Sequence, residues 1–388
     1  MPQRMLALVA LGQFFGMTLW FSATAAAPRI AAELALSESA TAWLTMAVQG
    51  GFVAGTLISA VLNLSDVFNA RRVFAAGCFA GAAANAGIAW SSDPSTIIAL
   101  RFTTGAALAC VYPPGMKIAA GWFLERRGSA LGVVVGALTL GSAFPHFLSW
   151  TAADVSWRTL IASSSALALI GGVVVGVFVQ DGPHVAASAP FDRHALGAVI
   201  RNRGARLATY GYLGHMWELY AMWAWIAAFA AASLPQQGEE AVRSGALVAF
   251  VAIASGAVGC VVAGLWADRW GKARIARVAL LTSGACSAAA AAFYGMPLVA
   301  LLIFTVIWGF SIVADSPQFS ALVSEYSPRT HVGTALTLQT CAGFLLTMVS
   351  MRLVPLVAAS YGWQWAFLVL VPGPILGALA MKSLIPDR

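Results

Sequence analysis

Two ionisable residues lie inside a long apolar stretch of this 388-residue chain, where a charged group is costly to bury. Glu218 and His215 stand three residues apart in GHMWELYAMWAW, so a helix would place both on one face. A buried carboxyl group beside an imidazole can take up and release a proton, which predicts a proton or substrate site. The alternative is a polar pair that only forms hydrogen bonds to the first or the eleventh predicted helix.

Asp315 is a third ionisable residue of this kind, in ADSPQFS, two residues before Pro317. A proline frees backbone carbonyl groups within a helix, and interrupted helices near the bilayer midplane are places where cargo is coordinated. We therefore expect Asp315 to be a site or gate residue. The alternative is that Asp315 is a cap, or one member of a polar pair, that supports the kink.

Four further residues in apolar stretches are candidates for contact with a substrate. Lys117 and Arg352 each offer a positive charge to an anion, but both lie towards the end of a stretch, where a long side chain can also reach the membrane surface. His146 occupies nearly the place of Arg352 in the other half of the chain. Trp217 could line a cavity, although tryptophans in such stretches also serve as packing or interface anchors.

The composition places the chain in a membrane. Its residues are 60% apolar and only 10% charged, whereas about 25% of the residues of a soluble domain are charged. The mean hydropathy is +0.81. A bilayer core needs about 20 apolar residues per helix, which divides the chain into twelve predicted helices. They start near residues 5, 41, 73, 96, 129, 158, 205, 244, 274, 297, 331 and 363.

Several function classes are excluded by what the sequence contains. The net charge of +7 does not indicate nucleic-acid binding, because Lys and Arg fall in short clusters between apolar stretches. The five cysteines stand singly, and we find no nucleotide-binding loop and no hydrolase motif. We therefore expect no cofactor, no metal and no direct use of ATP. A membrane-embedded enzyme is a remote alternative.

Basic residues predict the orientation in the membrane. If the chain crosses the membrane twelve times and its N-terminus is cytoplasmic, three basic residues lie on the opposite side: Arg29, Arg158 and Arg243. Sixteen fall in cytoplasmic loops or termini, which is the asymmetry expected of a multi-pass protein of the cell (inner) membrane. These are Arg4, Arg71, Arg72, Arg126, Arg127, Arg193, Arg201, Arg203, Arg206, Arg269, Lys272, Arg274, Arg277, Arg329, Lys382 and Arg388.

The chain repeats itself with an offset of about 204 residues. Gly105 and Pro113 have the same spacing as Gly309 and Pro317, and GSALG corresponds to GTALT after a basic loop in each half. The longest connection divides the predicted helices six and six. We therefore predict an all-α membrane protein with an N-terminal six-helix bundle at 1–180, a cytoplasmic linker at 181–204 and a C-terminal six-helix bundle at 205–388.

Two polar loops carry a resemblance to a known family. GLWADRWGKAR, which starts at Gly264, resembles the loop signature of the major facilitator superfamily: glycine, three residues, Asp-Arg, one residue, glycine and then bases. A degenerate copy, NLSDVFNARRVF, starts at Asn63, and RFTTGAALA from Arg101 resembles the fourth-helix signature. The resemblance implies two pseudo-symmetric six-helix bundles, transport across a membrane, and an Arg101 that pairs inside the first bundle.

The same resemblance implies that the loops form a conformational latch. Asp268 would face the positive end of the helix dipole at the start of the fifth helix, near Gly128, and Asp66 the start of the eleventh, near Val332. The alternative is a plain anchor of basic residues. The full latch set is Asp66, Arg71, Arg72, Asp268, Arg269, Gly264 and Gly271.

Two glycines of the latch set have backbone roles. Gly264 would let helix ends approach closely, and Gly271 would permit a turn with positive φ. Asn63 and Asn69 take these places in the degenerate copy, and asparagine tolerates a left-handed conformation, so we expect the turn to persist at Asn69.

These features predict a monomeric secondary transporter, in contact with membrane lipid, that moves a small solute by alternating access through a central cavity. We expect proton coupling through Glu218 or Asp315, and Arg352 with Lys117 favours a small organic anion or metabolite as cargo. The alternative is proton-antiport efflux of drugs or metabolites. However, the fifth helix lacks the Gly-Pro and paired-Gly pattern of exporting antiporters.

The stretch PPGMKIAAGWFLERRGSALG resembles the nitrate and cyanate porters of the superfamily. Nitrate porters carry an arginine in the second helix and another in the eighth, whereas 41–62 and 244–266 contain no base here. This difference argues against nitrate as the cargo.

Overall fold

The chain folds into helices only, as expected for an all-α membrane protein, in the residues that the computed structural model describes: 1–62, 64–123, 127–152, 155–184, 197, 201–328 and 331–385. Ten helical segments in these ranges are long and apolar enough to span a membrane. Helices α5 and α11 complete the predicted twelve. Arg71 and Arg72 in the first turn of α5, and Glu218 and His215 in α11, make these two more polar.

The first bundle contains the first six spans. The first and fourth spans are interrupted, and the sixth is continuous but ends in a π-helical turn. The first span is α1 with α2, the fourth is α6 with α7, and the sixth is α9 with a π-helical turn, η1. The bounds are Pro2–Met17 (α1), Ser22–Leu34 (α2), Glu38–Val61 (α3), Leu64–Val67 (α4), Ala70–Ile88 (α5), Pro94–Leu108 (α6), Tyr112–Trp122 (α7), Arg127–Thr151 (α8), Trp157–Val173 (α9) and Val174–Phe178 (η1).

The second bundle repeats this plan. The tenth span is α14 with α15, which corresponds to α6 with α7, and the twelfth begins with a 3-10 helix, η4. The bounds are Arg203–Ser233 (α11), Gly238–Trp270 (α12), Lys272–Phe293 (α13), Leu298–Ala314 (α14), Ser316–Tyr326 (α15), Val332–Tyr361 (α16), Trp363–Leu370 (η4) and Pro372–Lys382 (α17).

Eleven of the predicted spans begin within three residues of their expected starts. The exception is α12, which begins at Gly238, six residues before the expected start. Its first turn carries Glu239 and Glu240, and acidic side chains stabilise the N-terminal end of a helix through its dipole. The polar turn therefore extends the helix beyond the apolar stretch that predicted it.

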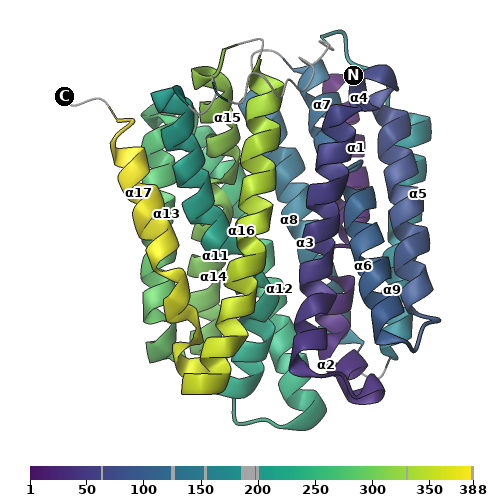
Figure 1. The fold of residues 1–388 in the computed structure, drawn as a ribbon, viewed down its shortest axis with the longest axis vertical. Helices are drawn as coiled ribbons and strands as arrows, with labels where there is room; N and C mark the ends of the chain where they lie inside the picture. Colours follow the sequence, from purple (N-terminus) through teal and green to yellow (C-terminus); the bar gives the residue numbers. More distant parts are fainter. Residues whose placement is uncertain are drawn as a thin grey trace.

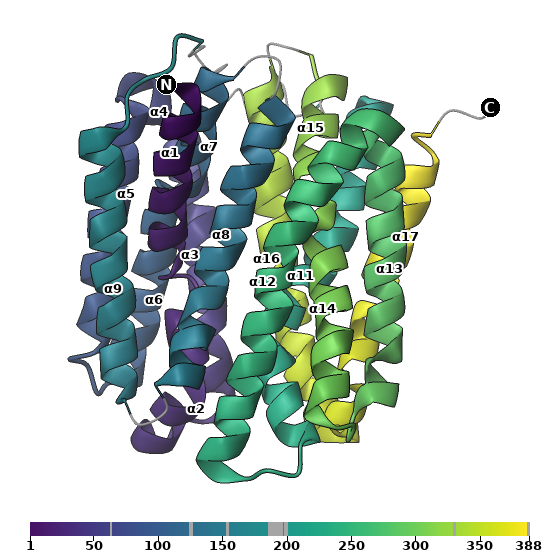
Figure 2. The ribbon, with the colours of Figure 1, turned by 180° about the vertical axis from the view of Figure 1, so that it is seen from behind.

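The two bundles lie side by side, with the start of α1 and the end of α17 at the same end (Figure 1). We call this end the terminal side and the opposite end the far side. Contacts between the bundles run along α8 with α12 and along α3 with α16. The reverse view shows α8 and α12 adjacent over their length (Figure 2). The exact domain boundaries stay a prediction, because 185–196 and 198–200 of the expected linker lie outside the described residues.

The interruptions of the fourth and tenth spans occur at equivalent positions of the repeat. Prolines occupy the first turn of α7 and of α15, where a missing N–H costs nothing but a continuous helix cannot form. Asp315 is the residue between α14 and α15. The spacing of Gly105 with Pro113 and of Gly309 with Pro317 therefore marks one structural unit that is used twice.

The repeated glycines lie where helices cross closely. A Cβ atom on Gly105 would lie 2.0 Å from the backbone oxygen of Val48 in α3, and one on Gly309 would lie 1.7 Å from that of Ala252 in α12. No side chain fits at such distances. The crossings of the second span with the fourth, and of the eighth with the tenth, therefore depend on these glycines.

Replacing Gly105 or Gly309 by alanine should lower the stability of the protein, because the added methyl group meets a backbone carbonyl that cannot move away. The expected loss is about 1–3 kcal/mol, the usual cost of overpacking. Melting temperatures of the purified protein in detergent would measure it. The control is Gly132→Ala, whose methyl group would lie 3.6 Å from its nearest neighbour, the backbone oxygen of Cys260. Equal melting temperatures for all three variants would contradict these close crossings.

Candidate functional site

Aromatic side chains from both bundles meet between the bundles. The ring centroids of Trp20 and Phe52, from the first bundle, lie 5.0 Å apart, and that of Phe344 lies 4.6 Å from Phe52 and 5.6 Å from Trp20. Tyr220 lies 5.7 Å from Trp20. We call the set of mutually contacting rings the aromatic interface. It consists of Trp20, Phe21, Phe52, Tyr220, Trp223 and Phe344.

The aromatic interface stands where a central cavity was expected. Its rings are buried and occupy the space between α3, α11, α16 and the junction of α1 with α2. The bundles are thus in contact at this level in the structure. A solute that passes between them must replace ring contacts with contacts of its own.

Polar atoms without partners accompany these rings. Trp20 Nε1, Trp223 Nε1, both ring nitrogens of His146 and both amide atoms of Gln49 are buried and have no hydrogen-bond partner in the described part of the chain. The His146 ring lies 6.2 Å from that of Phe21, and Gln49 precedes Phe52 by one helical turn. Buried polar groups are nearly always paired in native proteins, so these atoms are candidates for contact with a solute.

Arg101 is fully buried in the first bundle and pairs with backbone oxygens. Its Nε donates to the Leu44 oxygen at 2.9 Å, while Nη1 and Nη2 donate to the oxygens of Leu19 and Trp20 at 2.9 and 2.5 Å. Leu19 and Trp20 belong to the interruption between α1 and α2, where carbonyls lack helical partners. Longer contacts of 3.4 Å reach Ser22 Oγ and Asn85 Oδ1. Arg101 thus holds the interrupted first span and positions Trp20.

A second cluster is buried inside the second bundle, and we call it the acidic core: Glu218, His215 and Asp315. Each of these residues is 1% exposed. Ser283 and Ser287 of α13 donate to the Glu218 carboxylate at 2.7 and 2.5 Å, and Trp308 Nε1 of α14 donates at 3.0 Å. Such charge-assisted hydrogen bonds replace the water that the carboxylate loses on burial.

The partner of His215 is Asp315 rather than Glu218. His215 Nδ1 lies 2.8 Å from Asp315 Oδ1, at the junction of α14 and α15. His215 and Glu218 share a broad face of α11, as their spacing predicts, but each reaches a different part of the neighbouring spans. The structure thus brings all three predicted residues into one bundle, with an arrangement of partners that the sequence did not specify.

Trp217 lies away from the aromatic interface. Its Nε1 donates to the backbone oxygen of Val369 in η4 at 2.9 Å, and its ring packs on Gly373 in α17. The expectation that it lines the central passage is therefore wrong. Trp223 stands there instead, because six residues of an α-helix turn the side chain through about 240°.

The remaining cationic candidates are only partly buried. Lys117 is half-buried in α7 and is not free of interactions. Arg352 is half-buried in α16, and none of the described carboxylates pairs with it. Residues 344, 348 and 352 follow one another at a spacing of four, so they lie along one stripe of the helix. Phe344 belongs to the aromatic interface, and Met348 approaches Gly50 of α3, so this stripe faces the first bundle.

The latch loops agree with expectation in part. Asp268 Oδ1 lies 3.7 Å from the position that a Cβ atom on Gly128 would occupy, which places the carboxylate beside the first turn of α8. Gly271 has a φ of 90°, so the predicted positive φ is confirmed. A Cβ atom on Gly264 would meet nothing within 4 Å, so the close approach expected there is absent.

The degenerate copy of the loop uses a different local structure. Asn69 has a φ of −60°, and its side chain accepts a hydrogen bond from the backbone N–H of Arg71, so it caps α5 and forms no left-handed turn. The expectation for Asn69 is thus wrong, because an asparagine side chain can satisfy a free N–H that a glycine cannot. Arg71 pairs with Asp181 at 3.0 Å, within the first bundle and the start of the linker.

The other latch residues are exposed or not described. The side chains of Arg72 and Arg269 are exposed. Asn63 and the side chain of Asp66 lie outside the described residues.

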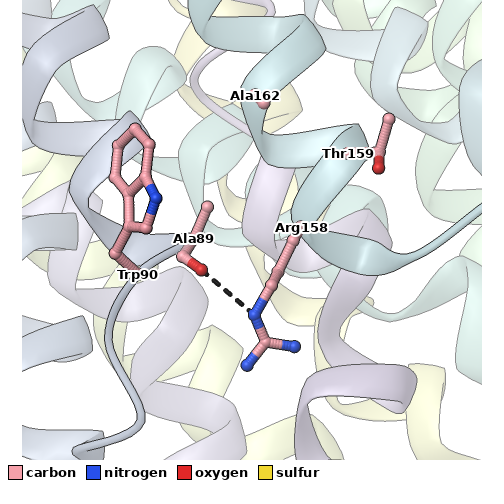
Figure 3. A pocket seen from close by; sticks show the side chains of 5 residues that line it. All are labelled: Ala89, Trp90, Arg158, Thr159 and Ala162. Atoms are coloured by element: carbon pink, nitrogen blue, oxygen red, sulfur yellow. Dashed lines mark hydrogen bonds between the residues drawn. The ribbon is translucent and has the colours of Figure 1, made fainter.

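A shallow groove lies on the first bundle, and Figure 3 shows the residues that line it. It is lined by Ala89, Trp90, Arg158, Thr159 and Ala162. The Arg158 guanidinium there donates to the Ala89 oxygen at 3.1 Å and pairs with Glu33 at 2.6 Å. Its charge is already balanced, and the groove contains none of the predicted site residues.

The site contains residues that sequence analysis missed, chiefly Gln49, Trp20, Phe52 and Phe344. Gln49 is a polar residue in the middle of an apolar stretch, which is the signal that could have identified it. The rings carry no such signal, because aromatic residues are common throughout the spans.

Comparisons with known proteins agree with this architecture. The profile of the family described as Major Facilitator Superfamily matches residues 9–313 and 241–388. The chain is 24% identical over 422 aligned positions to the hexuronate transporter of Escherichia coli (strain K12), covering 99% of this chain and 94% of that protein. It is 30% identical over 151 positions to the 4-hydroxybenzoate transporter PcaK of Pseudomonas putida, covering 38% and 31%.

Among solved structures, the fold is similar to that of the proton:xylose symporter XylE bound to 6-bromo-6-deoxy-D-glucose. The TM-score is 0.73 with 15% sequence identity, over 100% of this chain and 97% of that one.

Replacing Arg101 by lysine should destabilise the protein, because one ammonium group cannot reach backbone oxygens in both α3 and the interrupted first span. Each buried oxygen that loses its donor costs about 1–3 kcal/mol. The melting temperature in detergent should fall markedly. The same substitution at the exposed Arg72 is the control and should leave it unchanged. A stable Arg101→Lys protein would show that the guanidinium does not hold the interruption.

Proposed function

The chain belongs to the major facilitator superfamily and moves a small solute by secondary transport, and we propose that its cargo is a small organic anion whose movement is coupled to protons. Members of this superfamily are transporters, which excludes the alternative of a membrane-embedded enzyme. The observation that carries the proposal is the set of buried N–H groups without partners between the bundles. Such donors suit an acceptor such as a carboxylate.

Two further features support an anionic cargo. Hexuronate and 4-hydroxybenzoate, which name two of the relatives, are both carboxylates. Arg352 adds a positive charge on the stripe of α16 that faces the first bundle, towards the far side of the aromatic interface. A guanidinium group binds a carboxylate through two parallel hydrogen bonds, so Arg352 would hold the cargo's charge.

Proton coupling in this proposal takes place in the acidic core. Glu218, Asp315 and His215 together carry two acidic groups and one basic group in a space without water-exposed surface. When all three are charged, one negative charge remains uncompensated, which is costly in a membrane interior. Uptake of one proton by the cluster removes that charge, so binding and release of a proton would accompany the transport cycle.

Helix α11 would connect the proton site with the cargo site. Glu218 and Tyr220 are two residues apart, so their side chains point to roughly opposite sides of the helix. Glu218 faces α13 and α14, whereas Tyr220 contacts Trp20 and Phe344. A shift of α11 that follows protonation of Glu218 would therefore change the aromatic interface.

Alternating access in this proposal is a rocking of the two bundles about the aromatic interface. On the far side, Arg29 of α2 pairs with Glu239 of α12 at 3.0 Å, and Arg243 donates to the Trp150 oxygen at 3.0 Å. On the terminal side, Asp268 lies beside α8 and would act as the latch. We assign the terminal side to the cytoplasm and the protein to the inner membrane, because basic residues concentrate on that side.

Glu218→Gln should remove the dependence of transport on a pH gradient, because the amide cannot bind a proton. Uptake of labelled glucuronate and 4-hydroxybenzoate into proteoliposomes, with and without an imposed gradient, would measure this. Downhill exchange should persist in the variant. The matched control is Glu325→Gln, since Glu325 is a surface residue paired with Lys272. Unchanged gradient dependence in Glu218→Gln would remove this residue from the role.

Arg352→Met should raise the KM for a carboxylate cargo about 10- to 100-fold, which corresponds to loss of a charged hydrogen bond worth about 1.5–3 kcal/mol. Methionine keeps an unbranched apolar stem and removes the guanidinium group, so most of the packing of the stem is retained. Arg4→Met, at an exposed position of the terminal side, is the control. A KM equal to that of the wild-type protein would show that Arg352 does not bind the anion.

A further inference from the structure

We infer that the cargo carries an aromatic ring together with its carboxylate. This inference rests on the proposed function, because it names the chemistry of the anion that the central site admits. It follows from the aromatic interface and from the kind of polar atoms beside it.

The aromatic interface offers ring faces and edges on both sides of the bundle boundary. Trp20 and Phe52 belong to the first bundle, and Tyr220 and Phe344 to the second, with centroid distances of 4.6 to 5.7 Å across the boundary. Distances in this range are typical of favourable pairs of aromatic rings. When the bundles part to admit a solute, these contacts are lost. A cargo with a single aromatic ring restores contacts of the same kind with both bundles.

The unpartnered polar atoms beside the rings are chiefly donors. Trp20 Nε1 and Trp223 Nε1 can only donate, and the Gln49 amide nitrogen offers two further N–H groups. Neutral His146 supplies one donor and one acceptor, and Gln49 Oε1 is the other acceptor in this set. A carboxylate accepts hydrogen bonds and donates none. The donor excess therefore matches a carboxylate.

A polyhydroxylated acid matches this set poorly. Each of its hydroxyl groups brings an O–H that needs an acceptor, and the two acceptors in the set would be exhausted at once. The other hydroxyl groups would lie against ring carbons without partners, at a cost in free energy for each. An aromatic acid presents no such groups along its ring.

The arrangement also predicts how the cargo lies. The ring would occupy the space among Trp20, Phe52 and Phe344, while the carboxylate would point along α16 towards Arg352. The aromatic rings would thus bind the ring of the cargo, and Arg352 would bind its carboxylate. Ring contacts select the cargo, and the charge orients it.

The experiment compares binding of three carboxylates to the purified full-length protein in detergent: benzoate, cyclohexanecarboxylate and glucuronate. We expect benzoate to bind at least tenfold more tightly than glucuronate and several-fold more tightly than cyclohexanecarboxylate, which shares its size and charge. Isothermal calorimetry would give the dissociation constants. Equal or tighter binding of glucuronate would overturn the inference. Equal binding of cyclohexanecarboxylate would also overturn it, because an apolar ring would then suffice.

A variant separates ring recognition from anion binding. Phe344→Leu keeps an apolar side chain but removes the π-system, so it should weaken benzoate about tenfold and leave glucuronate unchanged. Phe79→Leu, at a half-exposed position of α5 away from the aromatic interface, is the matched control. Phe52→Leu should repeat the effect if Phe344→Leu does not fold. Parallel weakening of both ligands by Phe344→Leu would contradict a ring-specific contact.

The outcomes distinguish this inference from the proposed function. If glucuronate binds and benzoate does not, the protein remains an organic-anion transporter and only the inference about the ring fails. If none of the three carboxylates binds or is transported, the proposed anionic cargo fails, and the inference fails with it.

Discussion

A charge buried among apolar helices must be balanced by polar atoms close to it, and this requirement shapes both bundles. In the first bundle, the Arg101 cation is surrounded by backbone oxygens, two of which the interruption of the first span sets free. In the second bundle, serine and tryptophan donors surround Glu218, and His215 meets Asp315 at the interruption of the tenth span. The interruption of the first span is therefore part of the charge balance, because a continuous helix would keep those backbone oxygens for itself.

Because the buried charges are paired within each bundle, the contact between the bundles is largely made by aromatic rings. The contact at mid-depth is made by rings, and the described ion pair that joins the bundles, Arg29 with Glu239, lies at the far side. Each ring pair contributes only about 0.5–1.5 kcal/mol beyond the surface that it buries, and exposed ion pairs each contribute little. A helix-dipole contact such as that of Asp268 is also modest. Contacts of this size at the two ends can bias a two-state equilibrium without locking it, which is what a transporter that alternates between two openings needs.

Sequence analysis located the acidic core but not its arrangement. Glu218, His215 and Asp315 were conspicuous because ionisable residues are rare in apolar spans, and all three are buried in one bundle. The pairing of His215 with Asp315 depends on where α14 ends and on its rotation relative to α11. The residues near each of these positions in the sequence do not specify either quantity. The position of Trp217 could not be predicted either. The sequence is apolar on every side of α11, so it does not indicate which face of this helix meets the other bundle, and Trp217 faces η4 instead of the central passage. At Asn69, a side-chain cap replaced the expected turn, because the asparagine oxygen accepts a hydrogen bond from the free N–H of Arg71.

The twelve spans, the two-fold repeat, the positive φ at Gly271 and the ionisable residues within apolar spans could all be predicted from the order of the residues alone. These properties depend on the apolar length of a segment, on the absence of a Cβ atom or on residue type, all of which are local. The contacts between distant residues emerge from the packed fold: Arg101 meets the carbonyls of the interrupted first span, and Trp20 meets Tyr220 across the boundary. Such contacts depend on the rotation and depth of each helix relative to the others, which the packing of residues far apart in the chain sets all at once.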